Sequence, residues 1–298
     1  MEENLDTSIL AICSLANKPI NEDACIKLSN ENANFSSVIV ADGLGSNGYA
    51  SNASAFVVQW MQNKLLQLDD VAFIDFFEFF PLLKHALIAH VENFEVENNL
   101  SLDRFQNFGT TLICAVETEN EFILAYTGNG SIWHIKGNFN DFSAGRIIPW
   151  NSINYLSPHT VEESGREALY KLISPTDNFD EIVPTVIRIS KDKNYGDIIM
   201  ICSDGIFSQD QVRIGKNTTG AWMKIEDCLI DFYPYLNLFF NQKNENNLEY
   251  DFKDNFTFSE DNLTEIFQQY LAKGTWDDDA TLGIIVSKEA LLYQKTRK

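Results

Sequence analysis

Four acidic motifs lie where apolar segments of the sequence begin or end. They are Glu22-Asp23, Asp42-Gly43, Asp204-Gly205 and Asp277-Asp278-Asp279. Carboxylates at strand ends can converge in space although they are far apart in the sequence, and Mg²⁺ and Mn²⁺ prefer oxygen ligands. A carboxylate that bridges two such ions, roughly 3.5–4 Å apart, helps to hold a water that can attack a phosphoryl group. The motifs therefore indicate a two-metal hydrolase site.

Each motif also has an ordinary structural interpretation. Asp-Gly after a strand commonly forms a turn, and a run of three aspartates is commonly a solvated loop. The glycines favour the chemical interpretation, because a residue without a side chain lets a ligand approach the backbone closely. All four motifs together are much less expected by chance than any one of them.

The apolar pattern predicts the elements that position these motifs. Buried strands are expected over Ser36–Ala41, Asp197–Ser203 and Ala280–Val286. Helical spacing predicts helices over Ala50–Leu68, Pro81–Asn98, Ala221–Leu238 (broken by Pro234) and Leu263–Ala272, with a short helix at the C-terminal end. The strands are expected to deliver Asp42 and Asp204 at their tips, and Asp278 just before the third strand.

Three more strands are expected in succession, over Thr110–Val116, Glu121–Tyr126 and Ser131–Lys136. Turn signals separate them, so an antiparallel meander is predicted. Polar residues dominate 137–196, which predicts a loop or flap, and the Asn/Asp/Glu-rich stretch 241–262 predicts a surface insertion. No stretch resembles a linker, so a single domain is expected over residues 1–298.

Charge and cysteine usage exclude several classes of function. The 22 Lys+Arg against 43 Asp+Glu give a net charge of −21, which disfavours binding to nucleic acid or to anionic membranes. No apolar run is long enough to span a bilayer, and the acidic N-terminus does not resemble a signal peptide. The 5 cysteines are scattered and form no zinc-like spacing. They predict free thiols and a cytoplasmic protein.

Five short motifs occur in the order that characterises a known family. They are Asn21-Glu22-Asp23-Ala24, Ala41-Asp42-Gly43-Leu44-Gly45, Gly109-Thr110-Thr111-Leu112, Cys202-Ser203-Asp204-Gly205 and Asp278-Asp279-Ala280-Thr281. In this order the sequence resembles the metal-dependent Ser/Thr protein phosphatases of type 2C (PPM type), in particular the bacterial members, over nearly the whole chain. The resemblance implies an α+β fold, a four-layer α-β-β-α sandwich of two antiparallel sheets flanked by helices.

The resemblance also implies an activity and a set of ligands. A phosphorylated protein would be the substrate, with a Ser/Thr kinase as a possible partner, and a water bridging two Mn²⁺ or Mg²⁺ ions would hydrolyse the phosphomonoester. Asp42 would bridge the ions, and the Gly43 carbonyl would bind the second one. Asp204 and Asp278 would complete the coordination of the first ion. Glu22 and Asp23 would hold metal-bound waters.

Three positions depart from the family pattern. Lys18 stands where many members carry a phosphate-binding Arg, so it is either a weaker phosphate ligand or a solvated loop residue. Asn129 stands where many bacterial members have an Asp that helps to bind a third ion, which disfavours that ion here. Leu44 offers no general acid. Thr110 and Thr111 are expected in core and turn positions.

Two other functions stay open from the sequence. One is a catalytically weak or inactive module on the same fold that binds a kinase or another regulator. Lys18, Asn129 and the acidic insertion motivate it. The other is hydrolysis of a small phosphorylated metabolite.

Overall fold

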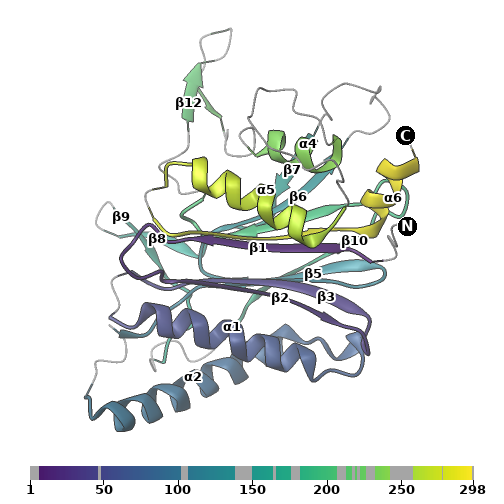
Figure 1. Ribbon diagram of the computed structural model, residues 1–298. Helices are drawn as coiled ribbons and strands as arrows, with labels where there is room; N and C mark the ends of the chain where they lie inside the picture. Colours follow the sequence, from purple (N-terminus) through teal and green to yellow (C-terminus); the bar gives the residue numbers. More distant parts are fainter. Residues whose placement is uncertain are drawn as a thin grey trace.

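The computed structural model describes residues 7–45, 48–101, 107–137, 150–163, 166–175, 182–206, 213–216, 219, 222–225, 232–241, 258–276 and 278–296 (Figure 1). The strands of the two main sheets are β1 (Ile9–Leu15), β2 (Asp23–Asn30), β3 (Phe35–Asp42), β4 (Leu112–Glu117), β5 (Glu121–Thr127), β6 (Ser131–Gly137), β7 (Trp150–Asn154), β10 (Thr185–Ser190), β11 (Ile198–Cys202) and β14 (Ala280–Val286). Two hairpins are formed by β8 (Thr160–Glu163) with β9 (Arg166–Leu169), and by β12 (Arg213–Lys216) with β13 (Trp222–Ile225). The helices are α1 (Ala50–Leu66), the 3₁₀ turn η1 (Val71–Phe73), α2 (Phe76–Asn98), α4 (Tyr233–Asn241), α5 (Glu260–Lys273) and α6 (Lys288–Thr296).

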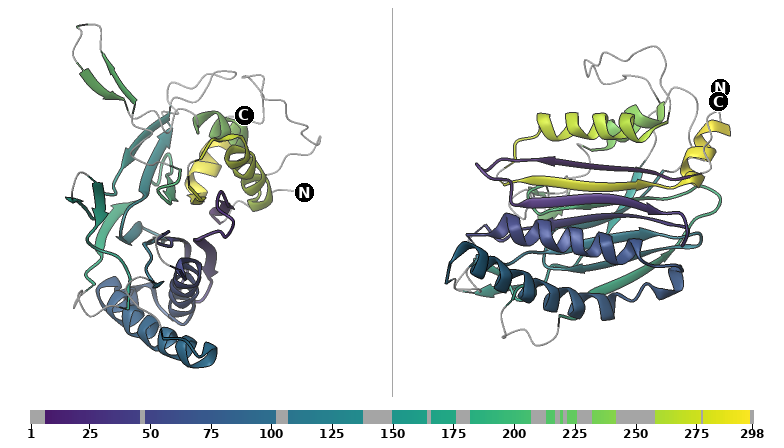
Figure 2. Two further views of the ribbon diagram at one scale, coloured as in Figure 1. Left: turned by 90° about the vertical axis from the view of Figure 1, so that its left-hand side faces the viewer. Right: turned by 60° about the horizontal axis from the view of Figure 1, so that its bottom comes forward.

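Two antiparallel sheets form the centre of the molecule. One has the strand order β1-β14-β11-β6-β7 and the other β10-β5-β4-β3-β2. Figure 1 shows α4 and α5 on the outer side of the first sheet, and Figure 2 shows α1 and α2 packed on the outer side of the second. The predicted four-layer α-β-β-α sandwich is confirmed.

Three buried clusters correspond to the three interfaces between these layers. Ile199, Ile201 and Ile285 of the first sheet meet Val38 and Val40 of the second in the middle cluster. The other two clusters join each sheet to its helices. Because both faces of β3, β11 and β14 are covered, these strands are continuous apolar runs rather than alternating ones.

Local signals explain where two helices begin. Asp75 caps α2 by accepting hydrogen bonds from the backbone amides of Phe77 and Glu78, so the helix begins at Phe76 rather than at Pro81 as predicted. The side chain of Ser259 caps α5 in the same way, through the amide of Asn262.

Two predictions of local structure are wrong. The third strand of the expected meander, β6, leaves the sheet of β4 and β5 and pairs with β11 and β7 in the other sheet. Its apolar residues Ile132, Trp133 and Ile135 are divided between the two faces, so the hydrophobic pattern does not say which sheet it joins. The helix expected over Ala221–Leu238 is replaced by β13, which pairs with β12, and by α4. The partner strand of β13 is not visible in the local pattern.

The segment 137–196, predicted as a loop or flap, contributes strands to both main sheets. β7 forms an edge of the first sheet and β10 an edge of the second. Of the predicted insertion 241–262, residues 242–257 lie outside the described part of the chain, while Phe258 is buried and Glu260 begins α5. None of the helices in the described ranges is both long and apolar enough to cross a bilayer.

Candidate functional site

The sheet pairing brings the four acidic motifs to the same end of the sandwich. Asp23 begins β2 and Asp42 ends β3, and the two residues are direct partners across the strand pair. In the other sheet, Cys202 at the end of β11 pairs with Leu282 near the start of β14. The residues that follow β11 therefore lie beside those that precede β14. Asp277 lies outside the described residues.

Three carboxyl groups are in direct contact in this region. The Asp42 carboxyl interacts electrostatically with those of Asp23 and Asp204. Burial raises the pKa of Asp42 well above its usual range, and the neighbouring charges of Asp23 and Asp204 raise it further. Burial likewise raises the pKa of Asp23 to about 7, although a hydrogen bond of 2.8 Å from the Ser203 hydroxyl opposes the change. Two of the three carboxyls are thus held in an environment that disfavours their negative charge.

The charge of this group is not balanced by the part of the chain that the structure describes. There, no ion pair links Asp23, Asp42 or Asp204 to a lysine, arginine or histidine. One carboxyl oxygen of Asp23, Oδ1, is buried without a hydrogen-bond partner. Carboxyl oxygens without a counter-cation are the type of donor that a hard divalent cation prefers.

The fourth predicted carboxylate, Asp278, has a different partner. Its Oδ1 lies 2.6 Å from the Lys18 ammonium, which also lies 2.5 Å from Oε2 of Glu22. Burial alone would lower the pKa of Lys18, but the contacts with Asp278 and Glu22 outweigh it and raise this pKa. The structure therefore joins Asp42, Asp23 and Asp204 in one group, and Asp278, Glu22 and Lys18 in another. Within the described residues, no three Asp, Glu, His or Cys side chains form a ready ligand set for one metal ion.

Asp279 fixes the loop of the second group, a role that the sequence did not reveal. It is buried, with 2% of its surface exposed. Its Oδ1 accepts hydrogen bonds from the backbone amides of Asn17 (2.7 Å) and Lys18 (3.0 Å), and its Oδ2 accepts one from the amide of Glu22 (2.8 Å). Asp279 thereby fixes the loop that carries Lys18 and Glu22. These contacts join residues far apart in the chain, so no local signal marks them.

Two glycines of the motifs are required by close backbone contacts. A Cβ atom on Gly205 would lie 1.9 Å from the carbonyl oxygen of Asp279, and one on Gly43 would lie 2.6 Å from that of Ala50. Any side chain at either position would push apart the loops that carry the aspartates.

Thr110 and Thr111 anchor the end of β3. The Thr110 hydroxyl and the Thr111 amide donate hydrogen bonds to the carbonyl of Asp42, at 2.9 and 2.8 Å. The Thr111 hydroxyl accepts one from the amide of Asp42, at 3.0 Å. Both threonines are buried, so they fix the backbone of Asp42.

Asn129 lies in the turn between β5 and β6 and contacts the carboxyl of Asp204. Its side-chain amide donates a hydrogen bond of 2.5 Å to Oδ2 of Asp204. Gly128 and Gly130 on either side have φ values of +101° and +111°, which glycine adopts readily. Two hydrogen bonds join Gly128 to His159: the Gly128 amide donates to Nδ1 of the ring (3.2 Å), and the His159 amide donates to the Gly128 carbonyl (2.9 Å). Asn129 therefore sits on a fixed turn and supplies a neutral donor.

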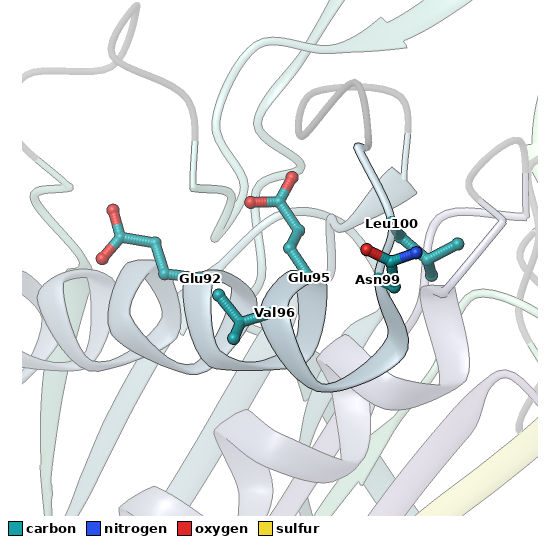
Figure 3. Close-up of a pocket in the computed structure, with 5 residues that line it drawn as sticks. All are labelled: Glu92, Glu95, Val96, Asn99 and Leu100. Carbon is teal, nitrogen blue, oxygen red and sulfur yellow. The ribbon is translucent and has the colours of Figure 1, made fainter.

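Apart from the acidic groups, the surface has a hollow of about 540 Å³ at the C-terminal end of α2. It is lined by Glu92, Glu95, Val96, Asn99 and Leu100 (Figure 3). Figure 3 shows Glu92 and Glu95 projecting from the same side of the helix. The lining includes none of the aspartates described above, so the hollow adds nothing to their chemistry.

Comparisons with known proteins agree with this fold. Residues 14–254 match the family described as protein phosphatase 2C. A bacterial serine phosphatase has a similar structure, with a TM-score of 0.57 at 14% identity over 93% of this chain and 97% of that one. The Ser/Thr phosphatase of S. agalactiae gives a TM-score of 0.59 at 14% identity, over 93% and 98%.

Other comparisons show how far the similarity extends. The Ser/Thr phosphatase Stp1 of Staphylococcus aureus gives a TM-score of 0.56 at 13% identity, over 93% of this chain and 94% of that one. A sex-determining protein of C. elegans gives 0.60 at 13% identity, over 98% of this chain and 68% of that one. A search of curated proteins finds no match. At these identities the solved structures support the fold alone.

Proposed function

Since the chain belongs to the protein phosphatase 2C family, we propose that it is a Mg²⁺- or Mn²⁺-dependent phosphatase acting on phosphoserine and phosphothreonine in proteins. One observation carries the proposal: the contacting carboxyls of Asp23, Asp42 and Asp204, with no counter-cation among the described residues. A purely structural cluster would be expected to contain a lysine or arginine, because an unpaired buried charge is costly.

Different acidic residues of the site would hold different ions. Asp42 would bridge two ions, the Gly43 carbonyl would contact one of them, and Asp204 would bind the other, with Asp278 once it is released from Lys18. Glu22 and Asp23 would hold bound waters. When bound, divalent ions supply a Lewis acid for phosphoryl oxygens and lower the pKa of a water. The chain's own part is to hold the carboxylates rigidly, through Thr110, Thr111 and Asp279.

A phosphorylated protein is proposed as the substrate because several structurally similar proteins are described as serine or serine/threonine phosphatases. A Ser/Thr kinase that phosphorylates the same substrate would be a natural partner. A cytoplasmic location is proposed because the cysteine thiols described next are free. Cys13, Cys25 and Cys114 are free, and burial raises the pKa of all three to about 12, as expected for inert core thiols.

A second function is favoured by two contacts in the site. Lys18 is paired with Asp278, and Asn129 supplies a neutral amide to Asp204. Both contacts occupy carboxylates that an active enzyme would give to metal ions. They support a weakly active or inactive binding module on the same fold.

Hydrolysis assays distinguish these functions. Wild-type protein is assayed with Mn²⁺ or Mg²⁺ on a phosphothreonine peptide and on an aryl phosphate, beside Asp204→Asn. Asp70→Asn is the matched control, because Asp70 is an exposed residue that caps η1. We expect metal-dependent turnover by wild type and Asp70→Asn, and loss of at least about 100-fold in Asp204→Asn. Unchanged turnover in Asp204→Asn would overturn the mechanism. No turnover by wild type would favour the binding module, and preference for the small ester would favour a metabolite phosphatase.

A further inference from the structure

The ammonium group of Lys18 occupies the position of a cation between two carboxylates. Its Nζ lies 2.5 Å from Oε2 of Glu22 and 2.6 Å from Oδ1 of Asp278. These are the two acidic residues of the proposed metal centre that do not belong to the Asp23–Asp42–Asp204 group. Their negative charge is therefore partly offset by Lys18, while no lysine, arginine or histidine of the described residues forms an ion pair with the other group.

Two further features fix the ammonium in this position. The backbone amide of Lys18 donates to Oδ1 of the buried Asp279, so the lysine's own backbone is held beside Asp278. A Cβ atom on Gly45 would lie 2.8 Å from the Lys18 Nζ and 3.0 Å from Oε2 of Glu22. The absence of a side chain at residue 45 thus leaves room for the Lys18–Glu22 pair.

We propose that Lys18 is a tethered competitor of the metal ions: its ammonium offsets part of the negative charge of Glu22 and Asp278 in the metal-free protein and is displaced when a divalent ion binds there. A lysine ammonium and a divalent cation repel each other when both approach the same carboxylate. Binding of the ion at Asp278 therefore weakens the Lys18 contacts and favours displacement of the ammonium. Because Lys18 remains tethered by its backbone, the displaced ammonium stays at the site, where it can meet an anionic substrate. This inference rests on the proposed metal-dependent function.

Metal affinity in variants measures the competition directly. Mn²⁺ is titrated by calorimetry into metal-free wild type, Lys18→Met and Lys27→Met. Lys27 is a matched control, since it pairs with Glu260 at 2.6 Å and its side chain is 31% exposed, against 32% for Lys18. Partly exposed ion pairs are weak, so removing the competitor should tighten Mn²⁺ binding by about threefold to tenfold. Lys27→Met should bind as wild type does.

A double variant separates competition from a general effect of charge. If Lys18 acts through Asp278, Lys18→Met should tighten Mn²⁺ binding much less in an Asp278→Asn background. An equal gain with and without Asp278, or an equal gain in Lys27→Met, would mean that only net charge matters and would overturn the inference. Equal affinity of wild type and Lys18→Met would overturn it as well.

Labelling of the unaltered chain gives a second readout that does not depend on the folding of a variant. Metal-free and Mn²⁺-loaded wild type are treated with an amine-reactive reagent, and modification of each lysine is quantified by mass spectrometry. We expect Mn²⁺ to increase the labelling of Lys18 and to leave Lys27 unchanged. Labelling of Lys18 that stays constant or falls would contradict displacement. Absence of Mn²⁺ binding to wild type would instead reject the proposed function itself.

Discussion

The carboxyl group of Asp23 offers a prediction in which loss of a site residue stabilises the protein. Burial raises its pKa from 3.8 to about 7. A carboxyl whose pKa is raised by folding favours the folded state at low pH, and this contribution is lost as the pH rises from 3.8 through about 7. At pH 8 the metal-free protein therefore carries a penalty of at most on the order of 4 kcal/mol from this group.

Asp23→Asn should remove that penalty. The amide oxygen can still accept the hydrogen bond from Ser203, and the new NH₂ group can donate to Asp42, which lies in contact with Asp23. We expect the metal-free variant to be more stable than wild type by about 1–4 kcal/mol at pH 8, and by much less at pH 5.

Urea unfolding followed by circular dichroism in EDTA, at pH 5 and pH 8, measures this difference. Asp70→Asn is the control for the loss of one surface carboxylate, and its stability should follow that of wild type at both pH values. If Asp23→Asn is less stable than wild type at pH 8, the contacting carboxyls are not an unfavourable feature of the metal-free protein. Their assignment to a cation would then fail.

Three further predictions concern neighbouring positions. Gly205→Ala should destabilise the protein by about 1–3 kcal/mol or more and abolish Mn²⁺ binding, because its Cβ would meet the Asp279 carbonyl at 1.9 Å. Gly48→Ala is the control, since its Cβ would meet only a side-chain oxygen, at 3.0 Å, and its urea unfolding should resemble that of wild type. Asn129→Asp should lower metal-free stability at pH 8 yet increase the number of Mn²⁺ ions bound in calorimetry; an unchanged number would show that this turn cannot supply a ligand. Burial lowers the pKa of His159 to about 4, so its contribution to stability is present above pH 6.5 and is lost as the pH falls toward 4; in urea unfolding, His159→Gln should lose less stability than wild type over this interval, and equal losses would contradict that pKa.

The sequence predicted the strands that carry the aspartates because those strands are buried on both faces. Their apolar runs are unambiguous, and β3, β11 and β14 lie within one or two residues of the expected bounds. Two of these runs end in an Asp-Gly pair, and because the ends of the runs were clear, the pairs indicated the site. Features that depend on a single strand and its tip are therefore readable from the sequence.

Features that depend on a distant partner were not readable. β6 has apolar residues on both faces and could have joined either sheet, and β13 is a strand only because β12 pairs with it. Asp279 looks like any residue of an acidic run, yet it accepts three backbone hydrogen bonds from the loop of Lys18. Lys18 was expected to bind phosphate or face solvent, and the pair with Asp278 could not be foreseen.

The central claim, that the group of Asp23, Asp42 and Asp204 is a divalent-cation site, is tested most directly by calorimetric titration of Mn²⁺ into metal-free wild type and Asp42→Asn. Asp42 contacts both other carboxyls, so its charge matters most. We predict saturable binding to wild type at up to millimolar Mn²⁺ and its loss in Asp42→Asn. No binding to wild type, or the same binding by both proteins, would contradict the claim.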